Sequence, residues 1–124
     1  MKLWAANISI RMAQQSAYPR FRHGAILESG GKILAKGVNA YKSITPDMAM
    51  SVHAEVAALK RYETISVRKR VIERATLYVA RVNPQEKIML SCPCQKCMKK
   101  IVDSDLVSDI YFSTENGWGH IVLP

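Results

Sequence analysis

A chain of 124 residues, of which 48% are apolar and 23% charged, has room for one hydrophobic core and the composition of a soluble globular protein. The formal net charge of +8 favours anionic partners, either phosphate-bearing small molecules or nucleic acid, unless it only marks a solvated basic surface. No apolar run approaches the roughly 20 residues of a membrane span, and residues 1–7 are not expected to act as a signal peptide. Three cysteines fit reduced thiols better than a disulfide framework, so we expect a cytoplasmic location.

The N-terminal third is predicted to form a helix and then a β-hairpin. An amphipathic helix over about residues 3–16 is indicated by apolar residues that recur four apart: Trp4, Ile8 and Met12. Two short apolar runs, residues 24–28 and 32–38, flank a Gly-Gly turn, which is typical of a hairpin.

The segment after the hairpin is predicted to lead into a second helix. Asn39 ends the second strand, where its amide either contacts a ligand or serves an ordinary turn. Residues 40–50 are expected to form a loop at the rim of a pocket, and Ser51 is expected to cap the helix that carries His53 and Glu55. Side chains two apart on a helix point about 200° from each other, so these two share a site only beyond the helix N-terminus.

The second half is predicted to contain a strand, a helix and two more strands. Basic residues 61–74 continue the helix into a loop or a second short helix, and residues 76–82 are β-branched and aromatic enough for a strand. Pro93 is expected to begin a helix with an inward stripe of Cys94, Cys97, Met98 and Ile101. Residues 107–112 and 118–123 are predicted strands that pair antiparallel, because no helix fits between them.

Four residues in two separate motifs form a candidate zinc site. His53, Cys94 and Cys97 offer three ligands and leave the fourth position for water, which is the arrangement of catalytic rather than structural zinc. Glu55 is then placed to carry protons to and from that water. Both motifs are expected at helix N-termini, where the helix dipole favours carboxylate and thiolate groups.

Other interpretations of these residues remain open. A C-x-x-C pair alone is also a redox pair or half of a structural zinc site, which needs a fourth ligand such as Cys92, His23 or His120. Cys92 is expected instead to be a buried neighbour of the site that forms a wall of the pocket, because it precedes the helix that aims both thiols. His23 is expected either to meet a phosphate or base or to hold structure, and Trp118 either to stack on a base or to pack in the core or an oligomer contact.

Together the H-x-E and P-C-x-x-C motifs resemble the cytidine and deoxycytidylate deaminase superfamily. The resemblance covers most of the chain, through residues 22–25, 37–39, 53–56, 94–97 and 110–113. We therefore expect one domain, residues 1–124, folded as a three-layer α/β/α sandwich with a mixed sheet of about five strands and an antiparallel last strand. The resemblance implies one catalytic Zn²⁺ and these roles: ligands His53, Cys94 and Cys97; acid and base Glu55; substrate contacts Asn39, the Ala54 N–H and the Cys92 carbonyl.

The expected function is zinc-dependent hydrolytic deamination of a cytosine nucleoside or nucleotide, a deoxycytidine species first of all. In its histidine ligand the chain resembles the deoxycytidylate, tRNA-adenosine and polynucleotide branches of the superfamily. In its expected antiparallel last strand it resembles the free-nucleoside and toxin-like branches. Small virus-encoded deaminases look similar in this mixture. Two alternatives are a deaminase acting on a base in single-stranded DNA or RNA, tRNA adenosine included, and a non-enzymatic zinc-stabilised nucleic-acid-binding module. The resemblance also implies a homo-oligomer.

Overall fold

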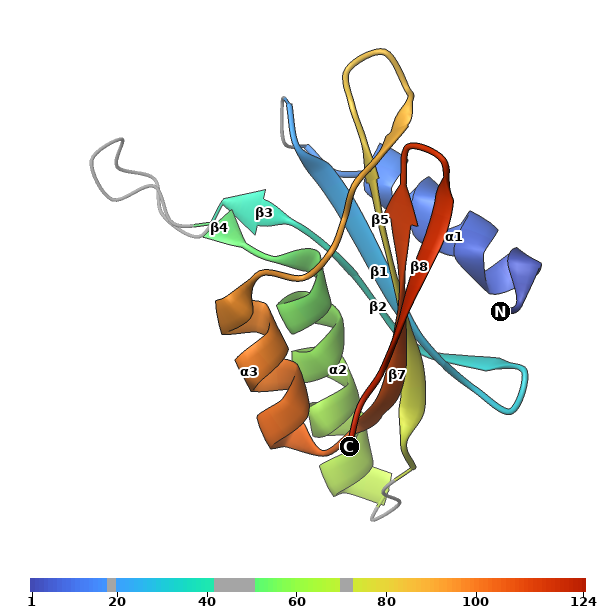
Figure 1. Cartoon of the computed structure of the whole chain (residues 1–124). Helices are drawn as coiled ribbons and strands as arrows, with labels where there is room; N and C mark the ends of the chain where they lie inside the picture. Colours follow the sequence, from blue (N-terminus) through green and yellow to red (C-terminus); the bar gives the residue numbers. More distant parts are fainter. Residues whose placement is uncertain (18–19, 42–50, 70–72) are drawn as a thin grey trace.

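The computed structural model describes residues 1–17, 20–41, 51–69 and 73–124. A central sheet separates α1 (Leu3–Gln14) on one face from α2 (Ala54–Lys69) and α3 (Gln95–Ser104) on the other (Figure 1). The predicted three-layer sandwich is therefore confirmed. Within the described ranges, no helix is long and apolar enough to cross a membrane.

The described residues form a six-stranded mixed sheet in the order β2-β1-β5-β7-β8, with β6 beside the end of β5. Only β5 and β7 are parallel, with α3 in the crossover between them, and the last pair, β7 and β8, is antiparallel as predicted. A separate two-stranded sheet pairs β3 with β4. The strands are β1 (Arg22–Ser29), β2 (Lys32–Val38), β3 (Ala40–Tyr41), β4 (Ser51–Val52), β5 (Ala75–Val82), β6 (Ile88–Met89), β7 (Val107–Thr114) and β8 (Gly117–Val122).

Strands β1 and β5 bury both of their faces, because successive side chains alternate across a sheet. The odd-numbered positions pack toward α2 and α3, in a core cluster that contains Ala25, Leu27, Leu77 and Val79. The even-numbered positions pack toward α1, in a cluster that contains Ile26 and Tyr78. The same alternation directs the side chains at the ends of these two strands.

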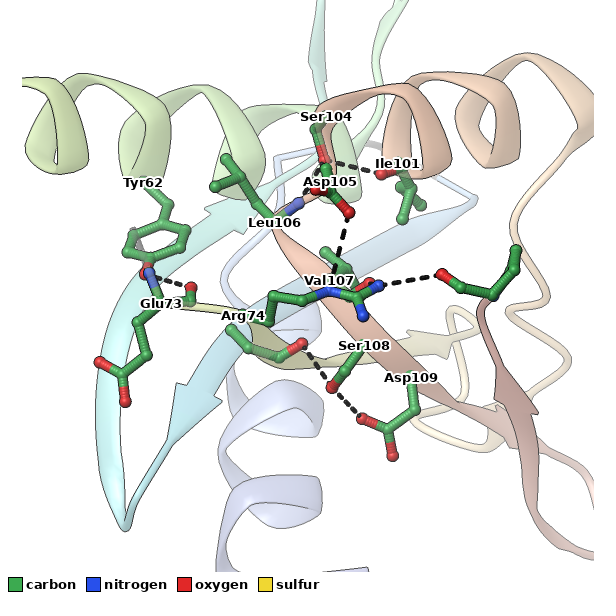
Figure 2. A network of polar contacts seen from close by, with 12 residues as sticks. Tyr62, Glu73, Arg74, Ile101, Ser104, Asp105, Leu106, Val107, Ser108 and Asp109 are labelled. Atoms are coloured by element: carbon green, nitrogen blue, oxygen red, sulfur yellow. Dashed lines mark hydrogen bonds and ion pairs between the residues drawn. The ribbon is translucent and has the colours of Figure 1, made fainter. Parts of the chain in front are cut away.

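A network around Arg74 joins the end of α3 to the sheet (Figure 2). Arg74 Nη2 donates hydrogen bonds to the carbonyls of Val107 at 2.9 Å and Pro124 at 3.3 Å. Its Nε lies 3.8 Å from Asp105, the left-handed residue that ends α3. These contacts fix the start of β7 at the opposite end of α3 from the thiol motif.

The helix and strand types are predicted correctly, and most differences lie at their ends. The first helix ends at Gln14 rather than near residue 16. Strand β6 is missed, because its two residues, Ile88 and Met89, carry no periodic pattern and depend on pairing with β5. Part of the expected loop, Ala40–Tyr41, is strand β3, and residues 42–50 lie outside the described residues.

Two expected helix starts are wrong by one or more residues. Ser51 is not a cap, because it lies in β4, and the His53 carbonyl instead accepts the first helical hydrogen bond, from Ala57 N at 3.0 Å. Pro93 is not the first helical residue either. Cys94 occupies the N-cap with φ −71° and ψ 167°, so the helix begins one residue later than a proline start implies. In each case a predicted zinc ligand itself takes the cap position.

Candidate metal centre

Helix α2 presents His53 and Glu55 at its N-terminal end. His53 precedes the helix and is exposed, whereas Glu55 lies in the first turn with a residue exposure of 5%. Two side chains at these positions of a regular helix would point in nearly opposite directions. His53 has cap backbone and Glu55 has helical backbone, so this restriction does not apply to them. A strand from the β3–β4 sheet leads directly into the cap and sets where the helix starts.

A glycine allows the start of α2 to lie directly on the sheet. An added Cβ at Gly37 would come within 2.5 Å of both the Ala54 carbonyl oxygen and the Ala58 nitrogen. No side chain other than hydrogen fits between β2 and this turn of the helix, so Gly37 determines how closely Glu55 approaches the sheet.

Helix α3 presents the two thiols. Cys94 is at the N-cap and exposed, and Cys97 is in the first turn with 3% exposure. Ile101, one turn further on, is fully buried in the core and holds the helix on the sheet. The predicted inward stripe therefore orients Cys97, while Cys94 is oriented by the cap.

The three predicted ligands meet at one point. The Cys97 Sγ lies 3.1 Å and the Cys94 Sγ 3.9 Å from His53 Nδ1, and the three ligand atoms lie within 4.8 Å of one another. Tetrahedral zinc with Zn–S near 2.3 Å and Zn–N near 2.0 Å separates its ligand atoms by roughly 3.6 Å. The donor types and spacing therefore fit one zinc ion held by three protein ligands.

The charge state of the same group also fits a cation. Burial, and then the nearby Glu55 carboxyl, raise the pKa of the Cys97 thiol above its usual range. Burial likewise raises the pKa of Glu55. A buried acidic cluster of this kind is balanced by a bound divalent cation, which deprotonates coordinating thiols.

A cavity of about 340 Å³ opens beside the metal ligands and has the size of a small-molecule site. Its wall contains most of the residues predicted to contact substrate. The lining residues are Phe21, His23, Asn39, His53, Glu55, Cys92 and Cys94.

His23 and Asn39 line this cavity and also hold it together. Asn39 Oδ1 accepts hydrogen bonds from the His23 backbone N–H at 2.8 Å and from Ser16 Oγ at 2.6 Å, and its Nδ2 donates to the Phe21 carbonyl. His23 Nδ1 lies 3.0 Å from Ser91 Oγ, and burial, Arg81 and His53 lower the pKa of His23 to about 4. The imidazole is therefore neutral near pH 7, and the Asn39 amide acts first as a brace between segments.

The structure does not bring Trp118 or His120 to the metal ligands. Trp118 packs on the α1 side of the sheet, against the cluster that contains Tyr78. His120 Nε2 lies 2.8 Å from Asp109 Oδ2, and its ring stacks on Tyr111 with centroids 4.1 Å apart. Within one chain, Trp118 thus has the packing role and His120 is not a fourth ligand.

Cys92 lines the cavity without joining the ligand group. The prediction that it is buried is wrong, because Cys92 is exposed in the segment before α3. Among the described residues the only cluster of three or more metal-binding groups is His53, Cys94 and Cys97. Ala54 is fully buried as the first residue of α2. Its backbone N–H belongs to the helical turn whose N–H groups have no intrahelical partner.

Sequence reasoning missed Phe21 and Arg81. Phe21 is 51% exposed at the cavity wall, and Arg81 Cζ lies 4.6 Å from the centroid of its ring. The available signal was the charge of Arg81 in an otherwise apolar strand, residues 75–82, on the side that faces α2 and α3. Phe21 had no comparable signal, because it lies just outside the strand.

The fold and site define a class of protein: an α/β/α sandwich with a candidate site for one zinc ion at the N-termini of two adjacent helices. Residues 2–114 match the family model of the cytidine and deoxycytidylate deaminase zinc-binding region, and the chain belongs to this family. It is accordingly a zinc-dependent hydrolytic deaminase. That membership rules out the alternative of a non-enzymatic zinc module.

Solved structures with the same fold include nucleotide and nucleoside deaminases. The dCMP deaminase of cyanophage S-TIM5, solved with dCMP and dUMP, is 25% identical over 90% of this chain and 82% of its own, with a TM-score of 0.68. The cytidine deaminase of Burkholderia pseudomallei has a TM-score of 0.68 at 14% identity over 98% of this chain and 92% of its own. The cytidine deaminase of Mycobacterium tuberculosis has a TM-score of 0.58 at 17% identity over 94% of this chain and 86% of its own. No curated protein matches the chain.

Proposed function

We propose that this protein hydrolytically deaminates the cytosine ring of a nucleoside or nucleotide, releasing ammonia and leaving a uracil ring. The observation that carries the proposal is the convergence of His53, Cys94 and Cys97 within 4.8 Å, beside a cavity that also contains the buried Glu55. The similarity to a cyanophage enzyme solved with dCMP and dUMP supports cytosine as the base.

The residues of the chain divide the chemistry among them. His53, Cys94 and Cys97 would hold the zinc ion, which when bound would supply the Lewis acidity needed to activate a water molecule. Glu55 accepts a proton from that water and delivers protons to the ring nitrogen and the departing amine. Burial raises the pKa of Glu55, which suits a group that must both accept and donate a proton near neutral pH.

Two backbone groups would orient the base. The Ala54 N–H, unpaired by helix geometry, would donate to the ring carbonyl, and the Cys92 carbonyl would accept from the amine. Both groups are close in sequence to predicted metal ligands, Ala54 directly after His53 and Cys92 two residues before Cys94, so they would orient the base beside the metal site.

A panel of substrates tests the proposal. Purified zinc-loaded protein is incubated with cytosine, cytidine, deoxycytidine, their monophosphates and cytosine-containing oligonucleotides, and products are identified by mass spectrometry alongside released ammonia. The Glu55→Gln variant is expected to retain zinc and to lose activity by about 10²-fold or more. Equal activity in the variant would exclude Glu55 as the proton carrier, and no turnover of any compound in the panel would overturn cytosine as the base.

A base within single-stranded DNA or RNA is a second candidate substrate. The net charge of +8 and the half-exposed Phe21 ring at the cavity favour it, because such a base has to be unstacked and held on an aromatic face. Oligonucleotide turnover that falls steeply with salt would support this candidate. Salt-insensitive turnover of mononucleotides would count against it. The homo-oligomer and the cytoplasmic location stay predictions.

A further inference from the structure

Arg81 lies on the face of the sheet that carries the metal site. It is the last but one residue of β5 and pairs in register with His23 of β1. Alternation places both side chains on the side of Leu77 and Val79, which pack toward α2 and α3. Arg81 is thus next to a residue of the cavity wall, at the end of the sheet where that cavity lies.

The guanidinium of Arg81 is held in place but not neutralised. Its Cζ lies 4.6 Å from the centroid of the Phe21 ring, which is a cation–π contact. Its Nε is buried and has no hydrogen-bond partner, and none of the ion pairs found in the described ranges includes Arg81. A partly buried cation with unused donors is costly unless something else binds it.

The neighbouring arginine shows the contrast. Arg22 Nη2 lies 2.6 Å from Glu86 Oε1 and donates to the Asn83 carbonyl at 2.7 Å. Its charge and donors are therefore satisfied within the protein. Arg81 is one strand away and has neither kind of partner among the described residues, which points to a ligand rather than to the fold as its counterion.

Both neighbours of Arg81 line the cavity. Phe21 and His23 form part of its wall, and the Arg81 charge is close enough to help lower the pKa of His23. Arg81 is not itself part of the cavity wall but lies directly behind it, next to Phe21 and His23. An anionic group of a bound molecule that reached past these two residues would meet a planar fork of N–H donors, the geometry that binds phosphate oxygens in pairs.

We infer that Arg81 binds the phosphate of a mononucleotide substrate and makes the site selective for the nucleotide over the nucleoside. This inference rests on the proposed function, since it assumes that the base of the same molecule is placed at the metal. A mononucleotide is favoured over a polymer because Arg81 adjoins the wall of a cavity of about 340 Å³, which has the size of a small-molecule site.

Steady-state kinetics on dCMP and deoxycytidine test the inference. Arg81→Gln is expected to lower kcat/KM for dCMP by roughly 10- to 100-fold, mainly through KM, and to leave deoxycytidine nearly unchanged. Arg81→Lys keeps the charge without the planar fork of donors, and its kcat/KM for dCMP is expected to lie between those of the unchanged protein and Arg81→Gln. Arg22→Gln is the matched control, since it removes an equal charge that Glu86 already satisfies, and it should not change the dCMP to deoxycytidine ratio.

Product binding separates this inference from the proposed function. Calorimetry with dUMP and deoxyuridine measures the phosphate contribution even if no cytosine compound is turned over. A dUMP preference that disappears in Arg81→Gln would support the inference, and equal losses for both ligands would overturn it by giving Arg81 a merely structural role. A variant that binds oligonucleotide with a reduced salt dependence but keeps its dUMP preference would also overturn it, in favour of a polymer phosphate.

Discussion

Cys97 and Cys92 are five residues apart but differ in environment. Cys97 is buried and lies 3.1 Å from His53 Nδ1, whereas Cys92 is exposed at the cavity wall and outside the ligand cluster. At the scale of single residues, this contrast separates a site with three protein ligands from a closed structural site with four.

We expect Cys97→Ser to lose zinc and Cys92→Ser to keep one zinc per chain. Loss of a thiolate removes one of only three protein ligands, while Cys92 contributes none. Metal content after gel filtration, measured by mass spectrometry, checks both variants. Loss of zinc from Cys92→Ser would mean that the site is closed by a fourth protein ligand, and water would have no place on the metal.

At the scale of elements, two glycines set how closely the helices approach the sheet. An added Cβ at Gly24 would lie 2.2 Å from Ala13 N in α1, and one at Gly37 would lie 2.5 Å from Ala54 O in α2. Both clashes involve helix backbone, which cannot rotate away as a side chain can. Of these two helices, only α2 carries residues of the predicted metal site, so substitutions at the two glycines have different consequences.

Gly37→Ala and Gly24→Ala are both expected to lower the free energy of unfolding by about 2 kcal/mol or more. Only Gly37→Ala is also expected to weaken zinc binding, by roughly tenfold or more, because it moves the helix start that holds His53. Urea unfolding with a chelator present measures the first effect, and competition with a zinc indicator measures the second. Equal zinc affinities in the two variants would show that α2 is free to shift without disturbing the site.

At the scale of the whole molecule, a hydrogen-bonded carboxylate joins three strands. Asp109 of β7 accepts from Thr76 Oγ1 of β5 at 2.8 Å and from Ser108 Oγ at 2.9 Å, and it pairs with His120 of β8 at 2.8 Å. Burial alone would raise the pKa of Asp109, but the hydrogen bonds from His120, Thr76 and Ser108 outweigh it and hold the pKa below its ordinary value of 3.8.

Asp109→Asn is expected to destabilise the protein at neutral pH and to matter less in acid. Because the pKa is lower in the folded state, the carboxylate stabilises the fold above about pH 3.8, and the contribution is lost as the pH falls through the lowered value. Thermal unfolding from pH 7 to pH 3, with chelator throughout, should show a deficit of about 1–2 kcal/mol at pH 7 that shrinks below pH 4. Exposed Asp103→Asn is the matched control, and a deficit constant with pH would contradict the explanation.

Much of this molecule follows from local pattern. The periodicities of residues 3–16, 24–38 and 76–82 predict the layers correctly, since burying an apolar face requires a repeat of 3.6 or 2 residues. The ligand set follows from spacing too, because each half of the motif lies within one turn of chain. Helix starts were less predictable, since His53 and Cys94 take cap positions that other residues fit better by propensity.

The sequence by itself predicted a group of three candidate zinc ligands, the carboxyl beside them and the sandwich that carries them, and the structure brings the three side chains together. Only the tertiary structure decided that Trp118 packs beneath α1, that Asn39 braces three segments, and that Arg81 stacks on Phe21 beside the cavity. The physical reason is the separation of the interacting residues along the chain. Motifs and periodic faces are set by neighbours in the chain, whereas these contacts join residues far apart, through strand order and register that no local pattern specifies.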